Sequence, residues 1–98
     1  MIMRKKVFIS GKVSGLEYVE ACRLFYDCAR KVLRLGFTPV IPVEICKSHW
    51  SWRRCMAVCL WHLLWSDGFC QLENWENSRG ARIEYKFAKF LRKKFIVV

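Results

Sequence analysis

The segment Lys5-Lys-Val-Phe-Ile-Ser-Gly-Lys-Val-Ser-Gly15 decides the fold class of this sequence. Its first six residues form a short apolar run with β-branched and aromatic side chains, which is typical of a buried strand. Gly11 ends this run, and the loop up to Gly15 leads into a helical pattern. A strand, a loop and a helix in this order predict an α/β domain with a parallel sheet.

The rest of the chain alternates helical and strand patterns in the same way. Helical spacing covers Glu17–Leu35, and Gly36 ends it. The other predicted elements are helices at Trp50–Trp65 and Gly80–Lys93, strands at Phe37–Ile41, Gly68–Leu72 and Phe95–Val98, and loops at Pro42–Ser48 and Glu73–Arg79. Because the strands are apolar throughout, helices must cover both faces of the sheet. We expect a Rossmann- or flavodoxin-like three-layer sandwich of about four parallel strands, formed as one domain by residues 1–98.

Composition limits the classes of partner. The chain has 98 residues, of which 18 are basic and 8 acidic, and its net charge of +10 favours anionic partners such as nucleotides, phosphates or nucleic acid. No apolar run reaches the roughly 20 residues of a membrane span. The apolar run near the N-terminus is also shorter than a signal-peptide core. We therefore expect a cytoplasmic protein with no membrane partner.

Six cysteines in so short a chain would suggest disulfides in an oxidising compartment. Here Cys22, Cys28, Cys55 and Cys59 all lie within helical patterns, and no leader segment is evident. We therefore expect buried free thiols that act as small apolar side chains.

The cysteines and histidines between residues 46 and 62 are candidate metal ligands. Zinc sites usually pair cysteines two to four residues apart in turns. Cys55 and Cys59, and likewise Cys59 and His62, share one predicted helix, and neither Cys46 nor His49 completes a second pair. We expect no bound metal.

The three loops at the carboxyl ends of the strands are the expected ligand site of such a sheet. In the first, Gly11 and Gly15 allow close backbone approach, and the following helix start favours anions. The loop matches neither the GxGxxG pattern nor a P-loop. Its pattern is consistent with phosphate or sugar contact and equally with a tight turn that binds nothing.

Glu84 is an acidic residue on the apolar face of the last predicted helix. That face consists of Gly80, Glu84, Phe87, Ala88 and Leu91, whereas Arg82, Lys86, Lys89 and Lys93 share another. Glu84 either stabilises the helix start through the macrodipole or supplies a nucleophile or base at the ligand edge. The basic stripe carries no recognition motif, so we interpret it as a solvated helix face; nucleic-acid binding through it is the weaker alternative.

Four tryptophans cluster in and beside the second predicted helix, at positions 50, 52, 61 and 65. They are too many for one helix face against a small sheet. Some are therefore expected at an interface between copies of the chain, most simply in a homodimer.

Three segments carry a resemblance to a known family: Val7–Leu16, Trp52-x₃-Met56 and Trp75-Glu-Asn-Ser-Arg-Gly-Ala-Arg-Ile-Glu84. They resemble a small domain family of unassigned function that is grouped with the nucleoside 2-deoxyribosyltransferases. The resemblance implies a Rossmann-like sheet with a pocket for a nucleoside or nucleotide and no cofactor. It also implies that Glu84 attacks the sugar C1′ and displaces the base.

The resemblance assigns further residues to the pocket. Ser10, Gly11, Lys12 and Gly15 would line the sugar or 5′-phosphate site. The segment from Trp75 would contribute Ser78 and Gly80 beside the ribose, and Asp67 would lie near the pocket or fix its geometry.

The sequence departs from the family pattern at three positions. Ser78 and Cys59 stand where acidic residues are common, and Asn74 replaces a glycine. Lost acids remove proton donors for the leaving base, a step worth roughly 10²–10⁴ in rate. The sequence therefore supports two hypotheses, an enzyme acting on the N-glycosidic bond and a nucleotide-binding module with weak or no activity. Ser78 and the positive charge favour a 5′-monophosphate as ligand.

Overall fold

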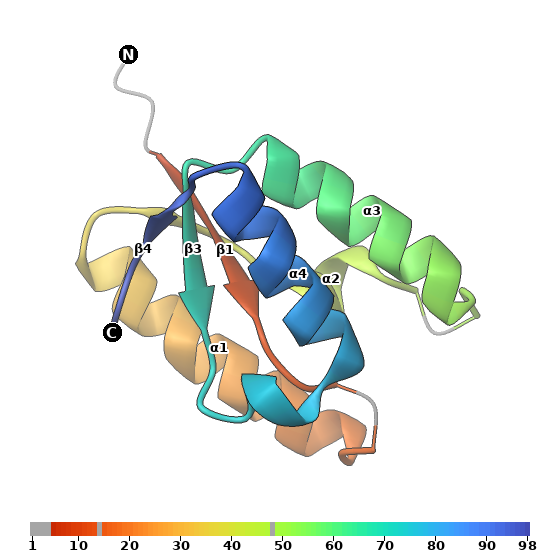
Figure 1. The fold of residues 1–98 in the computed structure, drawn as a ribbon. Helices are drawn as coiled ribbons and strands as arrows, with labels where there is room; N and C mark the ends of the chain where they lie inside the picture. Colours follow the sequence, from red (N-terminus) through yellow and green to blue (C-terminus); the bar gives the residue numbers. More distant parts are fainter. Residues whose placement is uncertain (1–4, 14, 48) are drawn as a thin grey trace.

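The computed structural model describes residues 5–13, 15–47 and 49–98, and it has the expected α/β architecture (Figure 1). A four-stranded sheet has the order β2-β1-β3-β4, and every pair of neighbours is parallel. The strands are β1 Lys6–Ser10, β2 Thr38–Val40, β3 Gly68–Gln71 and β4 Lys94–Phe95. The last strand begins one residue before the predicted Phe95–Val98 and is shorter, because only Lys94 and Phe95 pair with β3.

Helices connect the strands and cover both faces of the sheet. They are α1 Tyr18–Arg34, α2 Pro42–Ile45, α3 Trp52–Leu64 and α4 Arg79–Phe90, with a 3₁₀ turn, η1, at Trp75–Asn77. Helix α2 corrects the prediction of a loop over Pro42–Ser48. Pro42 opens this helix at a position where a missing N–H costs nothing. Helix α4 ends before the predicted Lys93, because Arg92 adopts a left-handed φ of 57°.

The two faces of the sheet have separate apolar cores. Helix α1 packs Phe25 and Val32 against Val7 and Ile9 of β1 on one face. On the other face, α3 and α4 cover the aromatic side chains of the two central strands; this second core comprises Phe8, Cys59, Leu63, Phe69 and Ala88. The strand residues alternate between the two cores, as a strand covered on both faces requires. The three-layer prediction is therefore confirmed.

The strand order places a topological switch point between β1 and β3. The chain leaves β1 toward β2 on one side, whereas β3 and β4 lie on the other. Ser10, the last residue of β1, pairs with Gln71 at the end of β3. A crevice between two such strand ends is the usual ligand site of an open α/β sheet.

No helix within the described residues is long and apolar enough to cross a membrane.

Candidate functional site

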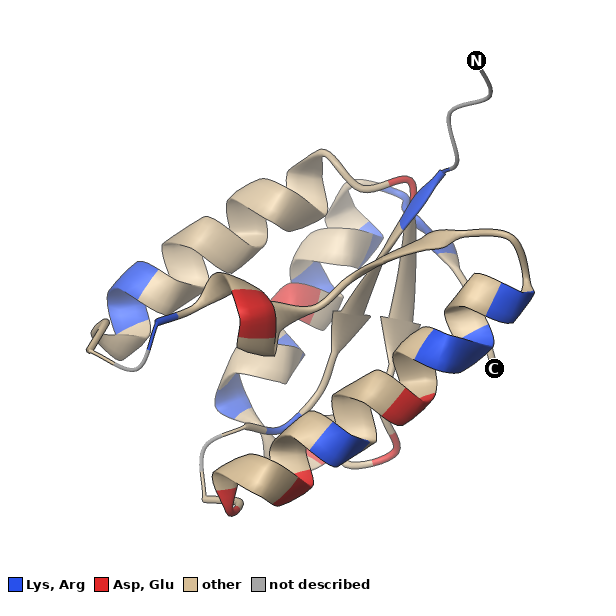
Figure 2. Cartoon of the chain, turned by 180° about the vertical axis from the view of Figure 1, so that it is seen from behind, with Lys and Arg blue, Asp and Glu red and all other residues tan. Residues whose placement is uncertain are grey.

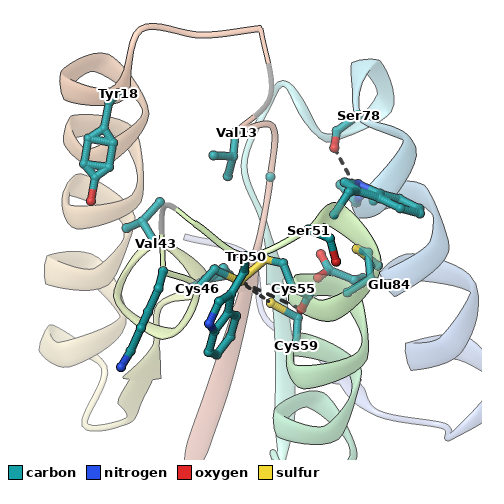
Figure 3. Close-up of a pocket in the computed structure, with 17 residues that line it drawn as sticks. Val13, Tyr18, Val43, Cys46, Trp50, Ser51, Cys55, Cys59, Ser78 and Glu84 are labelled. Carbon is teal, nitrogen blue, oxygen red and sulfur yellow. Dashed lines mark hydrogen bonds between the residues drawn. A yellow bond between two sulfur atoms is a disulfide. The ribbon is translucent and has the colours of Figure 1, made fainter.

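A cavity of about 890 Å³ opens at the carboxyl ends of β1 and β3. Its walls come from the loop after β1, from the segment between Pro42 and Cys59, and from the first turns of α4 (Figure 3). Its volume is in the range of cavities that hold a small organic ligand. The cavity thus lies where the strand order predicts a ligand.

Glu84 lies in the wall of this cavity and is held by Ser10. The Ser10 Oγ donates a hydrogen bond of 2.7 Å to Glu84 Oε1, and Ser10 is completely buried. Glu84 itself is 5% exposed, on the second turn of α4 where that helix faces the sheet. The last residue of β1 therefore fixes the orientation of the carboxyl group on α4.

Burial raises the pKa of the Glu84 carboxyl to about 7, and the hydrogen bond from Ser10 only partly offsets this rise. Among the described lining residues Glu84 is the only acid and Lys47 the only cation. A carboxyl with a pKa near neutrality, facing a cavity, is a frequent feature of catalytic sites. Glu84 can exist in both protonation states at neutral pH.

Ser78 and Gly80 also line the cavity, at the N-terminus of α4. The Ser78 Oγ accepts a hydrogen bond of 3.2 Å from Ala81 N, so it caps the helix and keeps its own proton available for another acceptor. A Cβ on Gly80 would lie 3.0 Å from Met56 Sδ, which accounts for a glycine at this contact between α4 and α3. Helix N-termini attract anions, so this wall of the cavity suits a phosphate or a sugar oxygen.

The loop after β1 forms another side of the site. Gly11 lines the cavity, and a Cβ there would come within 2.4 Å of Leu72 Cδ1. The backbone N of Lys12 donates a hydrogen bond of 3.0 Å to Asn74 Oδ1. Asn74 therefore ties the first loop to the loop after β3, a role that the glycine common at this position cannot fill. Gly15 has a φ of +86° and does not line the cavity.

The segment between α2 and α3, with the first residue of α3, supplies a wall that the sequence did not identify residue by residue. Lys47, Trp50 and Trp52 line the cavity. The Arg54 guanidinium lies 4.4 Å from the ring centre of Trp50, and that of Arg79 lies 4.8 Å from the ring centre of Trp52. The rim thus combines aromatic surface with positive charge. The signal for this wall was topological, because the segment follows the carboxyl end of β2.

The prediction of free thiols is wrong for two of the six cysteines. Cys46, after α2, and Cys55, in the first turns of α3, form a disulfide in the cavity wall (Figure 3). A helical pattern around Cys55 does not prevent this bond, because Cys46 approaches from outside the helix. Cys22, Cys28, Cys59 and Cys70 are free thiols. Burial and the nearby Glu84 carboxylate raise the pKa of Cys59 to about 12.

Five residues that the resemblance assigned to the pocket lie outside its lining: Ser10, Lys12, Gly15, Asp67 and Trp75. Trp75 stacks on Tyr85, with 4.8 Å between ring centres, and stabilises η1 against α4. Asp67 precedes β3 at the amino edge of the sheet, where its Oδ2 accepts a hydrogen bond of 2.8 Å from Lys6 N. Asp67 therefore closes the opposite end of the β1–β3 pair and does not lie near the cavity.

Two basic side chains, Arg82 in α4 and Lys93 after it, bind backbone oxygens of the same chain. The Lys93 Nζ donates to the carbonyl oxygen of Leu64, at 2.8 Å, where α3 ends. The Arg82 guanidinium donates to the carbonyl oxygen of Glu76, at 2.9 Å. On the face seen in Figure 2, Lys and Arg are spread over several helices, with Asp and Glu between them on α1. Arg82, Lys86 and Lys89 are exposed, as the interpretation of a solvated helix face requires.

A family described as a domain of unknown function, DUF4406, matches residues 5–97. No curated protein matches the sequence. Among solved structures, a 2-desoxiribosyltransferase from Leishmania mexicana is similar, with a TM-score of 0.68 and 17% sequence identity. The alignment covers 95% of this chain and 63% of that chain, so this chain spans somewhat less than two thirds of the transferase. At this identity the likeness shows a shared fold.

Proposed function

The chain belongs to the DUF4406 family, and we propose that it acts on the N-glycosidic bond of a deoxynucleoside or its 5′-monophosphate, with Glu84 as nucleophile. The observation that carries this proposal is the Glu84 carboxyl in the wall of the cavity at the switch point, held by Ser10 at 2.7 Å. The similar fold of a deoxyribosyltransferase supports the same class of substrate.

The proposed reaction proceeds in two displacements. Glu84 Oε attacks the sugar C1′, the C1′–N bond breaks, and its electron pair leaves with the base, which takes up a proton. Water or a second base then attacks C1′ and releases the Glu84 carboxylate. Ser10 keeps one carboxyl oxygen engaged, so we expect the other, Oε2, to face the sugar.

The cavity also offers groups that suit a 5′-phosphate. Ser78 has a proton to donate, and the N–H groups of Arg79 and Gly80 belong to the first turn of α4. Lys47 adds a positive charge among the lining residues. An aspartate at position 78 would repel a phosphate, whereas Ser78 is uncharged and does not. We therefore propose a nucleoside monophosphate as the preferred ligand.

The base has room against the indole rings in the same wall. Trp50 and Trp52 line the cavity, and stacking on such rings tolerates several bases. Cys59 is the nearest replacement for an acidic group, but a thiol with a pKa of about 12 is a poor proton donor. We therefore expect slow turnover, because protonation of the leaving base falls largely to water.

The test is release of free base from a panel of deoxynucleosides and their 5′-monophosphates, followed by chromatography. Glu84→Ala and Glu84→Gln are expected to lower the rate by at least about 10³-fold, as loss of a nucleophile does. Glu76→Gln is a matched control, since it makes the same chemical change at an exposed carboxylate of the same segment. No release above the Glu84→Ala background would contradict the proposal.

A binding module without turnover is the second candidate. Among the described lining residues Glu84 has no acidic partner, and this observation favours it. Calorimetry with the same panel separates the two candidates. Nucleotide binding without base release would support the module, and absence of both would contradict both functions.

We further propose that the protein is cytoplasmic. We also propose that it forms a homodimer through the outer face of α3. Trp61 and Trp65 are 59% and 65% exposed and contact one another with 5.8 Å between ring centres. Sedimentation analysis of the wild type and of a Trp61→Ser, Trp65→Ser double variant tests this. A monomeric wild type would contradict it.

A further inference from the structure

The three cysteines of the cavity wall form a cluster that the proposed reaction does not use. Their sulfur atoms all lie within 4.8 Å of one another, and they belong to Cys46, Cys55 and Cys59. The Sγ atoms of Cys46 and Cys59 are 3.6 Å apart and not bonded. Figure 3 shows the third sulfur below the disulfide, on the side of Glu84. We call this set the three-sulfur cluster.

The surroundings of the cluster leave it few ordinary partners. Cys59 is buried in the second core between α3 and the sheet, while Cys46 and Cys55 are partly buried above it. Apart from the Cys46–Cys59 contact, the sulfurs make one hydrogen bond within the described part of the chain, a weak one from Cys46 Sγ to the backbone oxygen of Cys55. In a reducing compartment a disulfide at this place opens, and grouped cysteines then more often bind metal.

We propose that the three-sulfur cluster, once its disulfide is reduced, is a binding site for a thiophilic divalent cation such as Zn²⁺. A dithiol reductant reduces the Cys46–Cys55 bond to two thiols and is itself oxidised to a disulfide. The cation then binds three thiolates and displaces three protons into solvent. A disulfide oxidant re-forms the bond between Cys46 and Cys55 and is itself reduced to two thiols; this removes two of the three ligands and releases the cation.

The geometry fits such an ion. At a Zn–S distance of about 2.3 Å, two thiolates of a tetrahedral site lie about 3.8 Å apart. Cys46 and Cys59 already have nearly this separation, at 3.6 Å. Cys55 and Cys59 are four residues apart on α3 and so project from the same side of the helix. All three residues line the cavity, so a fourth coordination position faces the ligand space.

The second pair of close cysteines provides a contrast within the same chain. Cys28 and Cys70 approach to 3.5 Å on the α1 face of the sheet. Among the described residues no third cysteine, histidine or acid joins them in a group that could hold a metal ion. Two ligands in an apolar core do not make a zinc site, so this pair serves as a control.

The test uses the full chain after reduction and removal of the reductant under anaerobic conditions. Cd²⁺ is added as the probe, and thiolate binding is followed by the ligand-to-metal charge-transfer absorption in the ultraviolet. We expect one equivalent of Cd²⁺ per chain, displaced competitively by Zn²⁺. The oxidised protein, with the disulfide intact, is expected to bind no Cd²⁺ until it has been reduced and the reductant removed.

Variants locate the ion. Cys59→Ser and Cys55→Ser are expected to weaken binding by about 10²-fold or more, as loss of a ligand does. Cys28→Ser is expected to bind like the wild type. Far-ultraviolet circular dichroism of each variant shows whether it is folded. A double variant with Cys46→Ser and Cys55→Ser cannot form the disulfide in any condition. If the reduced wild type binds no Cd²⁺, or if only Cys28→Ser abolishes binding, the proposal is wrong.

Discussion

The two faces of the sheet have the same strands behind them but different interiors. On the α1 face, Phe25 and Val32 are completely buried against β1 and fill the space between helix and sheet. On the other face, α3 and α4 share an apolar core near Phe69, and toward the carboxyl ends of the strands they border the cavity that contains Glu84. The α1 face is closely packed and stabilises the fold. The face covered by α3 and α4 is less completely packed, because it borders a cavity and contains a buried carboxyl group.

The largest expected effect contrasts packing on the two faces. Phe25→Ala should destabilise the fold by about 3–5 kcal/mol, because it leaves a closed void. Met56→Ala should cost only about 2 kcal/mol, near the lower end for such a truncation, because Met56 borders the cavity and water can enter the space. Urea unfolding of both variants measures the difference. Equal losses would show that the cavity face is as tightly packed as the α1 face.

The next effect concerns the buried carboxyl. The Glu84 pKa is about 7 in the folded protein, against an ordinary value of 4.5. Between these values the folded state holds a proton that the unfolded state has released. Glu84 therefore lowers stability as pH rises from about 4.5 to about 7, by about 3 kcal/mol in total.

Glu84→Gln removes this dependence, since the amide does not ionise. We expect the variant to exceed the wild type in stability at pH 8 and to lose that advantage near pH 4.5. Urea unfolding of both proteins across this range, in the presence of a chelator, gives the difference directly. A difference that does not change with pH would contradict the burial of an ionisable Glu84.

A smaller loss of stability is expected for a substitution in the loop after β1. Gly11→Ala places a Cβ within 2.4 Å of Leu72 Cδ1 and 2.8 Å of Leu72 Cβ, so the ends of β1 and β3 must separate. Overpacking of this kind costs about 1–3 kcal/mol. Val13→Ala, at an exposed position of the same loop, should change stability by less than about 0.5 kcal/mol. Thermal unfolding of both variants compares the two, and equal values would show that the loop adapts to the added carbon.

The smallest expected change in stability is at Asp67, whose carboxylate lies at the opposite edge of the sheet from Glu84. Asp67→Ala loses the hydrogen bond from Lys6 N and should lower stability by about 1 kcal/mol. At pH 8 this change has the opposite sign to that of Glu84→Gln. Urea unfolding at that pH measures both. A gain in stability for Asp67→Ala would show that Asp67, like Glu84, destabilises the folded state instead of stabilising it.

Most of the fold follows from local sequence patterns. Apolar runs such as the one over residues 5–10 identify strands, and helical spacing identifies α1, α3 and α4 within a few residues. Their order then implies a parallel sheet and the edge at which a ligand binds. Helix α2 was missed because four residues show no helical period.

The site is only partly readable from the sequence. Glu84 stands out because an acid on an apolar helix face needs a reason, and the structure supplies Ser10 as its partner. Contacts between distant segments are not encoded locally. The Cys46–Cys55 bond and the link from Lys12 to Asn74 depend on how loops meet in space. Asp67 is the opposite case. The family resemblance placed it near the pocket, but it lies at the amino edge of the sheet, where it binds Lys6 N.

A crystal structure of Glu84→Gln with a deoxynucleoside 5′-monophosphate tests the central proposal most directly. We expect the nucleotide in the cavity between β1 and α4, with its phosphate near Ser78 and the start of α4. The sugar C1′ should lie about 3–3.5 Å from the side chain at position 84, the separation needed for attack. A nucleotide bound elsewhere, or one whose sugar faces away from position 84, would contradict the proposal.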